Sequence, residues 1–291
     1  MELRAYAADQ VARLFEKFTA EIARTVKQCD PDAVHDLRVS IRRLNQGLRV
    51  FRSFYPRREM KPLRKQLKRI MRFAGATRDT DIAVEFCVKH GISKESDLSV
   101  RLAVQRNSAA RDLLAALRQT RPGALPQPAQ CETSSLPPEK LARDTLPILV
   151  NKYRAAAEDA ASLAASTKDM HQFRIQGKRL RYSLELFRPI YGPGLEEKLN
   201  VLRKAQQFLG DVNDCESMRQ LLLACGVDVP RRLLAAVDSR QKKRIREFRD
   251  FWKSTWADRE FGRRWINYLA VYPGRVGYSR KARPAAARQT G

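Results

Sequence analysis

Residues 34–52, VHDLRVSIRRLNQGLRVFR, carry two parallel rows of side chains along one predicted helix. The first row is apolar, with steps of three and four residues: Val34, Leu37, Ile41, Leu44, Leu48, Phe51 and Tyr55. This spacing is typical of a helix that packs one face into the core of a bundle. The second row, one position further on, is almost entirely basic: His35, Arg38, Arg42, Asn45, Arg49 and Arg52. One residue turns an α-helix by about 100°, so this basic row lies beside the core face.

The same pattern occurs a second time in the chain. Residues 35–55 align with residues 171–191, and eight of the twenty-one positions are identical. Lys178 stands at the position of Arg42 and keeps a basic residue there. The second basic row reads His171, Arg174, Lys178, Arg181, Glu185 and Arg188. The chain therefore contains an internal repeat, and two of its three histidines occupy the same position in the two copies.

A shorter repeat follows each of these helices. The segment FAGATRDTD at 73–81 aligns with FLGDVNDCE at 208–216. Since glycine is favoured just past the end of a helix, Gly75 and Gly210 predict that a helix ends within each segment.

Helix-forming patterns cover most of the chain, and no run alternates as a strand does. We therefore expect an all-α fold, with helices at 3–27, 33–55, 60–74, 80–89, 97–119, 139–165, 169–188, 194–209, 213–224 and 230–252. Prolines and small polar residues mark a linker at 122–138. The linker separates a first helical repeat, 1–121, from a second, 139–270. A basic tail at 271–291 is predicted to be disordered.

The charge of the chain points to a polyanionic partner. Fifty-seven Lys and Arg residues against thirty-two Asp and Glu leave a net charge of +25. Nucleic acid, an anionic membrane surface and inorganic polyphosphate all match such an imbalance. Composition alone does not choose among them.

The cysteines and the apolar segments bear on the compartment. The five cysteines are scattered and none forms a CxxC pair, which favours a reducing environment over a disulfide framework. The first residues do not have the pattern of a secretory signal, and no apolar run is long enough for a membrane helix. We therefore expect a cytoplasmic protein without a membrane partner.

The density of like charge argues for an anion-binding site. Between residues 35 and 72 there are thirteen basic residues and two acidic ones. Charge rows on helices are usually solvated, but such rows normally mix signs, because like charges three or four residues apart destabilise a helix. An unmixed row present in both repeats favours a bound anion. Arginine suits this role, since its planar guanidinium can hold two phosphate oxygens and stays charged.

These motifs resemble the CHAD family, a helical domain named for its histidines. The resemblance rests on VHDLRVSIRRLNQGLRVF, MHQFRIQGKRLRYSLELF, AGATRDTD and LGDVNDCE, and it extends over roughly residues 1–270. It implies two four-helix bundles related by pseudo-twofold symmetry, a basic groove between them, and binding of inorganic polyphosphate at polyphosphate granules. The chain has no ExExK motif, so it resembles a stand-alone member without a CYTH domain. The second repeat has Asn213 at the position of Arg78 and Glu185 at the position of Arg49. We therefore expect the second repeat to bind the anion more weakly.

The basic rows and the resemblance together define the predicted polyphosphate-binding residues. They are His35, Arg38, Arg42, Arg43, Arg49, Lys65, Lys68, Arg69, Arg72, Arg78, His171, Arg174, Lys178, Arg179, Arg181 and Lys204. Arg43 and Arg179 lie opposite the apolar face, so a solvated position is an equally open interpretation for them. The two histidines either contact the ligand or pack between helices.

Other functions remain as alternatives. Residues 240–291 hold fifteen basic and four acidic residues and would bind any polyanion, nucleic acid included, without specificity. Against a dedicated nucleic-acid site, no aromatic side chains for base stacking are interleaved with the basic row. A scaffold on polyphosphate or polyester granules, with granule-associated partner proteins, would use the same basic surface.

Catalysis and a cofactor have no support in the sequence. It contains no Ser/His/Asp set, no glycine-rich phosphate loop and no HExxH motif. Four acidic residues remain as an alternative metal site: Asp79, Asp81, Asp214 and Glu216. The preferred interpretation is that they cap the next helix or orient nearby arginines. We expect no enzyme activity, no cofactor and no bound metal.

Overall fold

The computed structural model describes residues 1–120, 125–162, 165–256 and 259–271. In these ranges the chain is helical and contains no strand, which confirms the all-α prediction. The helices are α1 Leu3–Lys27, α2 Pro31–Val50, α3 Lys61–Lys89, α4 Asp97–Arg118, α5 Pro138–Ala161, α6 Thr167–Leu186, α7 Arg188–Tyr191, α8 Gly194–Leu223, α9 Arg231–Trp256 and α10 Arg259–Val271. None of the described helices is both long and apolar enough to cross a bilayer.

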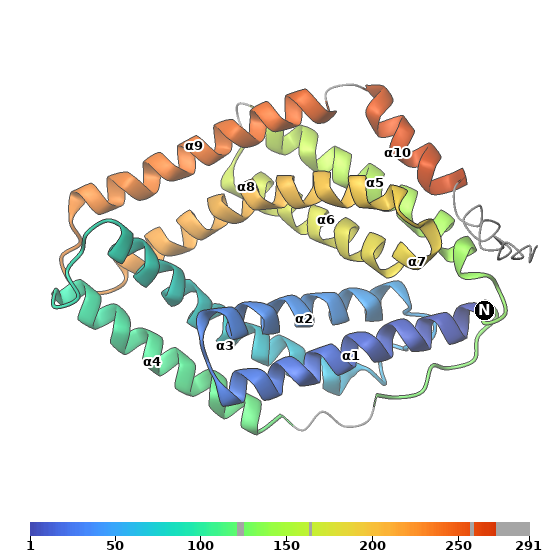
Figure 1. Cartoon of the computed structure of the whole chain (residues 1–291), viewed down its shortest axis with the longest axis horizontal. Coiled ribbons are helices and arrows are strands. Elements are labelled where there is room, and N and C mark those ends of the chain that lie inside the picture. Colours follow the sequence, from blue (N-terminus) through green and yellow to red (C-terminus); the bar gives the residue numbers. More distant parts are fainter. Residues whose placement is uncertain (121–124, 163–164, 257–258, 272–291) are drawn as a thin grey trace, which may run out of the picture.

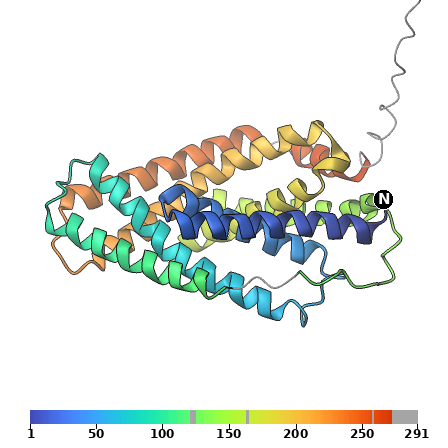
Figure 2. The ribbon, with the colours of Figure 1, turned by 60° about the horizontal axis from the view of Figure 1, so that its bottom comes forward.

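The two halves of the chain are built from the same kind of helix pair. α1 packs on α2 and α3 on α4, while α5 packs on α6 and α8 on α9 (Figure 1). Figure 2 shows the α3–α4 and α8–α9 pairs side by side at one end of the molecule. The halves meet where α2 contacts α6 and α3 contacts α8. The pseudo-twofold relation between two bundles, and the proposed domain limits, stay predictions.

Several predicted helix boundaries are wrong, and the main reason is the interpretation of glycine. The segments 60–74 and 80–89 form one helix, α3, and 194–209 and 213–224 form one helix, α8. Gly75 and Gly210 lie inside these helices, and neither adopts a positive φ. The positive-φ glycines that follow α3 and α8 are Gly91 and Gly226. Asp79 and Asp214 therefore do not cap a new helix.

Other differences lie at helix ends and in the linker. α2 ends at Val50, five residues before the predicted end, and α10 was not expected as a separate helix. The described part of the linker is bonded to the first half, with Leu3 N donating to Leu136 O at 2.8 Å and Ala129 N to Phe54 O at 2.9 Å. The predicted disordered tail, beyond Val271, lies outside the described residues.

Aromatic packing holds the C-terminal ends of α2 and α6 together. Phe51 and Phe187, which are equivalent in the repeat, meet edge to face with ring centroids 6.1 Å apart. Tyr6 of α1 stacks on Phe187, and its hydroxyl donates to Leu186 O at 2.5 Å. All three side chains are buried in one core that extends across both halves. A second buried cluster joins α3 and α4 to α8 and α9 at the other end (Figure 1).

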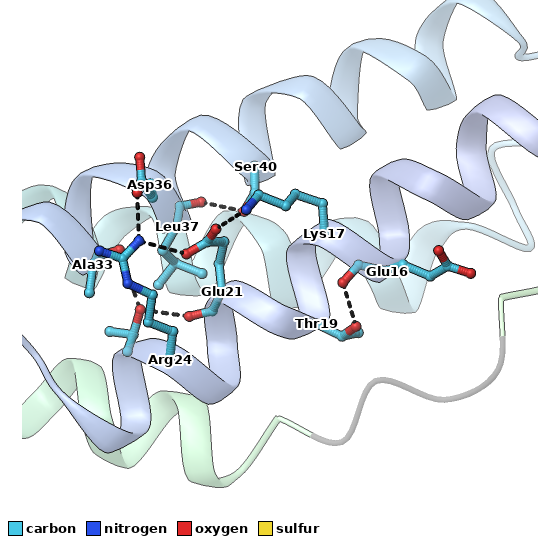
Figure 3. Close-up of polar contacts among 10 residues, drawn as sticks. Glu16, Lys17, Thr19, Glu21, Arg24, Ala33, Asp36, Leu37 and Ser40 are labelled. Atoms are coloured by element: carbon cyan, nitrogen blue, oxygen red, sulfur yellow. Dashed lines mark hydrogen bonds and ion pairs between the residues drawn. The ribbon is translucent and has the colours of Figure 1, made fainter.

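Ionic contacts fix the start of α2 against α1. The buried Glu21 carboxylate pairs with Lys17 at 2.6 Å, and Arg24 Nη1 lies 3.5 Å from the same carboxylate (Figure 3). Arg24 also donates to Asp36 Oδ2 at 2.6 Å across the helix pair. Asp36, the acidic residue next to His35, is thus held towards α1 and away from the basic row.

Replacing Tyr6 by Phe tests the link between the halves. The change keeps the ring but leaves the buried Leu186 carbonyl without this donor, which costs about 1–2 kcal/mol of unfolding free energy. Urea unfolding followed by circular dichroism measures the loss. An unchanged midpoint and slope would show that this hydrogen bond does not hold α1 against α6.

Candidate anion-binding site

A pocket of about 280 Å³ lies where α2, α3, α6 and α8 meet. All four helices contribute side chains to this central pocket, which is lined by His35, Arg38, Val39, Arg42, Arg78, Asp79, Ile82, Arg174, Lys178, Arg181, Tyr182, Gln206, Gln207, Gly210 and Asp214. Six of these are cationic side chains and two are carboxylates. The central pocket therefore concentrates positive charge between the two halves of the chain.

The basic rows predicted from the sequence supply most of the cationic side chains of this lining. α2 brings Arg38 and Arg42, one turn apart, and α6 brings Arg174, Lys178 and Arg181. Because α2 and α6 come together at their C-terminal ends, the rows beside their apolar faces meet in the space between them. The sequence thus identified side chains that the structure brings together in one pocket, although it gave no measure of how deeply they are buried.

Arg38 is positioned by the backbone of α3. Its Nη1 donates to the carbonyl of Ala74 at 3.1 Å. A Cβ added to the next residue, Gly75, would lie 3.2 Å from the same Nη1. Gly75 therefore leaves room for the guanidinium to lie against the helix. The glycine serves this close contact and does not end a helix, contrary to what the motif predicts.

Two carboxylates lie among the arginines. Asp79 and Asp214, equivalent in the repeat, line the central pocket together with Arg38 and Arg174. Burial lowers the pKa of both guanidinium groups, while the charges of Asp79 and Asp214 oppose this effect. Burial also raises the pKa of Asp79, and the nearby Arg38 partly offsets that shift. The charges of the two carboxylates thus favour the charged guanidinium groups, and the expectation that they also orient the arginines stays a prediction.

The pocket has more hydrogen-bond donors than acceptors. Arg174 Nε and Gln206 Nε2 are buried and have no hydrogen-bond partner among the described residues. The pKa of Lys178 is lowered to about 6 by burial first, and then by Arg174, Arg42 and Arg38. Burial and the neighbouring Arg78 and Arg42 also lower the pKa of His35. Buried donors without acceptors cost free energy, and an anion that enters the pocket would relieve this cost.

Two predicted site residues face protein partners instead of the pocket. Arg43 Nε contacts Glu185 Oε2 of α6 at 3.0 Å, so Arg43 forms an ion pair between the halves and is not simply solvated. Glu185 also lies 3.6 Å from Arg181. Arg179 contacts Gln176 of its own helix at 3.5 Å.

The remaining predicted residues lie outside the central pocket. Exposed positions on α3 hold Lys65, Lys68, Arg69 and Arg72. Lys204 Nζ lies 5.2 Å from the Phe251 ring centroid, and Arg49 lines a separate cavity with Arg52 and Lys140. His171 lines another cavity with Asn213 and Glu216, so the two repeated histidines do not have equivalent surroundings. Arg174 borders both this cavity and the central pocket.

Three polar residues of the pocket carry no signal in the sequence. Tyr182 accepts a hydrogen bond from Arg42 Nε at 3.2 Å, and Gln206 and Gln207 come from α8. Uncharged polar residues in a helix have no pattern that separates a pocket from a solvated face. Tyr182 aligns with Gln46 in the repeat, so the repeat did not mark it either.

The acidic residues do not gather as a metal site. Asp81 pairs with Arg106 at 2.9 Å, and Glu216 accepts from Gln220 at 2.8 Å. Within the described ranges, no group of three or more His, Cys, Asp or Glu side chains is placed to hold a metal ion.

Comparison with known proteins identifies a related family and a related fold. The family model described as "CHAD domain" matches residues 9–223. The solved structure titled "Crystal structure of the CHAD domain from the plant Ricinus communis" superposes with a TM-score of 0.57 at 19% identity, and the match covers 93% of each chain. At this identity the likeness shows the fold alone. The search of curated proteins finds no match.

Replacing Gly75 by Ala tests how Arg38 is positioned. The new methyl group would push the guanidinium by a few tenths of an ångström and so weaken its hydrogen bond to Ala74 O, while alanine raises helix propensity by about 1 kcal/mol. We expect unchanged or increased stability, and an affinity for long-chain polyphosphate about tenfold lower, the worth of one charge-assisted hydrogen bond.

Gly210→Ala serves as the stability reference for this change. No atom lies within 4 Å of the added Cβ there, so urea unfolding of this variant reports the propensity gain alone. Full affinity in Gly75→Ala, measured by titration calorimetry, would contradict the assigned role of Gly75.

Proposed function

Because the chain belongs to the CHAD family, which is associated with polyphosphate binding, we propose that it binds inorganic polyphosphate in the central pocket. The observation that carries the proposal is the convergence of six cationic side chains from four helices around two carboxylates. Arg174 and Gln206, which both line this pocket, each carry a buried nitrogen without an acceptor among the described residues, and this lack of acceptors favours an anionic ligand. Arginine guanidinium groups pair with such oxygens in bidentate geometry.

The arrangement favours a chain of phosphates over a single phosphate. The α2 row from His35 to Arg42 extends over roughly 10 Å of helix, at about 1.5 Å per residue. The α6 row from Arg174 to Arg181 has the same length and lies across the pocket. Two facing rows of this length match a linear anion that is charged at every unit.

The lining also favours a polyanion without bases. Tyr182 is the one aromatic residue in the described lining of the central pocket. It is buried, its hydroxyl is bonded to Arg42, and Arg181 lies over its ring at 4.8 Å. Base stacking needs an open aromatic face, and this pocket presents none. Nucleic acid would instead meet exposed basic residues such as Lys242 and Arg246 of α9.

We further propose that binding occurs without turnover and places the protein at polyphosphate granules. Asp79 and Asp214 are the carboxylates of the described lining, and both interact with the arginines Arg38 and Arg174. Carboxylates held in this way support a positioning role rather than acid–base chemistry. Granule-associated proteins remain proposed partners.

Neutralising two central arginines tests the proposed site. Arg38→Gln with Arg174→Gln removes two charge-assisted contacts of about 1.5–3 kcal/mol each, so affinity for long-chain polyphosphate should fall at least about 100-fold. Glutamine is preferred to glutamate, because a new carboxylate would lie beside Asp79 and Asp214. Calorimetry at near-physiological salt measures the change, and circular dichroism checks the fold.

The matched control removes the same charge from an exposed surface. Arg111→Gln with Arg118→Gln, both on the outer helix α4, should lower affinity by less than threefold. Equal losses in the two double variants would show that binding follows total charge and not the pocket.

Competition with duplex DNA and transfer RNA separates the proposal from general polyanion binding. Polyphosphate should outcompete both by orders of magnitude, and at a hundred times its Kd it should stabilise the fold by about 2.7 kcal/mol. Equal competition would place the nucleic-acid alternative first.

A further inference from the structure

Lys178 differs from the other cations of the central pocket because it can lose its proton. Arginine stays protonated at every physiological pH, whereas a lysine amine deprotonates readily when buried. In the repeat, Lys178 stands where the first half has Arg42. The sequence predicts that this exchange keeps the charge. In the pocket, however, Lys178 can become neutral and Arg42 cannot.

The surroundings of Lys178 are cationic on three sides. α2 presents His35, Arg38 and Arg42, α3 presents Arg78 with Asp79, and α6 itself presents Arg174, Arg181 and the Tyr182 hydroxyl. α8 presents Asp214, whose negative charge favours the protonated amine and so opposes the lowering of the Lys178 pKa. Lys178 has no hydrogen bond or ion pair among the described residues, so none of them holds its proton.

Burial and these like charges shift the amine to the neutral form in the empty pocket. The pKa of Lys178 is lowered to about 6, so the side chain is mostly uncharged at pH 7.5. A polyanion beside the amine reverses the balance, because it adds negative charge and neutralises the arginines that repel the proton. The same residue is therefore neutral when the pocket is empty and ammonium when it is filled.

We propose that polyphosphate binding at the central pocket is coupled to the uptake of one proton by Lys178, which makes capture tighter in acid and release easier in alkali. This inference rests on the proposed function. The balance is simple: the amine lone pair takes a proton from solvent as the anion enters and returns it as the anion leaves. The arginines supply a permanent attraction, and Lys178 supplies the part that depends on pH.

The sign of the effect follows from linkage. Between the pKa of the empty site and that of the filled site, the complex holds one more proton than the free protein, so affinity falls as pH rises. If the filled site restores the ordinary lysine pKa of about 10.4, Kd increases by nearly tenfold per unit, up to about 100-fold from pH 7 to pH 9. Internal phosphates of a long chain do not titrate in this range.

Two variants of Lys178 isolate its contribution. Lys178→Arg keeps a permanent charge, and Lys178→Met keeps a similar length without a titratable group. Both should flatten the dependence of Kd on pH between 7 and 9, with Lys178→Arg the tighter binder at pH 9. Lys94→Met, in the exposed loop after α3, serves as the matched control and should keep the full slope.

Calorimetry in two buffers of different ionisation enthalpy counts the protons directly. At pH 7.5 and constant ionic strength, long-chain polyphosphate should draw close to one proton into the wild-type complex and close to none into either Lys178 variant. His35→Gln should keep most of this uptake, because we assign the proton to the Lys178 amine. Loss of the uptake in this variant would instead assign the proton to the His35 imidazole.

The empty protein gives an independent readout. An unfolded lysine holds its proton up to about pH 10.4, so the unfolded state binds more protons than the folded state above pH 6, and stability should rise with pH in that range. Lys178→Met should remove this part of the rise in urea unfolding experiments.

The outcomes distinguish the inference from the proposed function. Wild-type protein that binds polyphosphate with the same Kd at pH 7 and pH 9 and without proton uptake would overturn the proton coupling and leave the binding function intact. Proton uptake that persists in Lys178→Met would also overturn it. Absence of polyphosphate binding at every pH would instead remove the proposed function on which the inference depends.

Discussion

Apolar packing holds together side chains that repel one another, and the rest of the structure depends on this balance. Five arginines in the central pocket are compensated by only two carboxylates, and Lys178 adds a further positive charge when it is protonated. They stay close because Phe51, Phe187 and Tyr6 hold α2 against α6 at one end, while the buried cluster of α3, α4, α8 and α9 closes the other. Burial of aromatic side chains contributes several kcal/mol, which offsets part of the repulsion between these cations.

The repeat explains the composition of the pocket, and its exceptions explain the chemistry. Arg38 with Arg174, and Asp79 with Asp214, show the symmetry of the repeat in sequence, and all four line the central pocket. Lys178 opposite Arg42 breaks this symmetry by introducing a group that can be neutral. Glu185, in the position of Arg49, breaks it again by pairing with Arg43 between the halves. The positions that are identical in the two repeats thus hold residues of constant charge, and the positions that differ change the charge of the pocket or of its surroundings.

The sequence predicted the helices and the basic rows because both follow from local periodicity. Arg38, Arg42, Arg174 and Lys178 were found in this way, and all four line the central pocket. Gly75 was misread, because a glycine that ends a helix and one that admits a guanidinium look alike without the partner helix. Tyr182 and Gln206 carry no periodic signal, since their role depends on which helices converge. Arg43 shows the same limit: its partner Glu185 is 142 residues away.

The division between buried and exposed cations bears on selectivity. Lys65, Lys68, Arg69 and Arg72 are exposed, so water already solvates them, and an anion at this surface gains little beyond screened attraction. Arg38, Arg174 and Lys178 have lost much of that solvation, as the direction of their pKa shifts shows. Only a ligand that enters the pocket relieves this cost. A bare phosphate chain can do so, whereas a nucleic acid must also find space for its bases. Under the proposed function, the exposed rows therefore attract any polyanion, and the central pocket selects the one that fits between the helices.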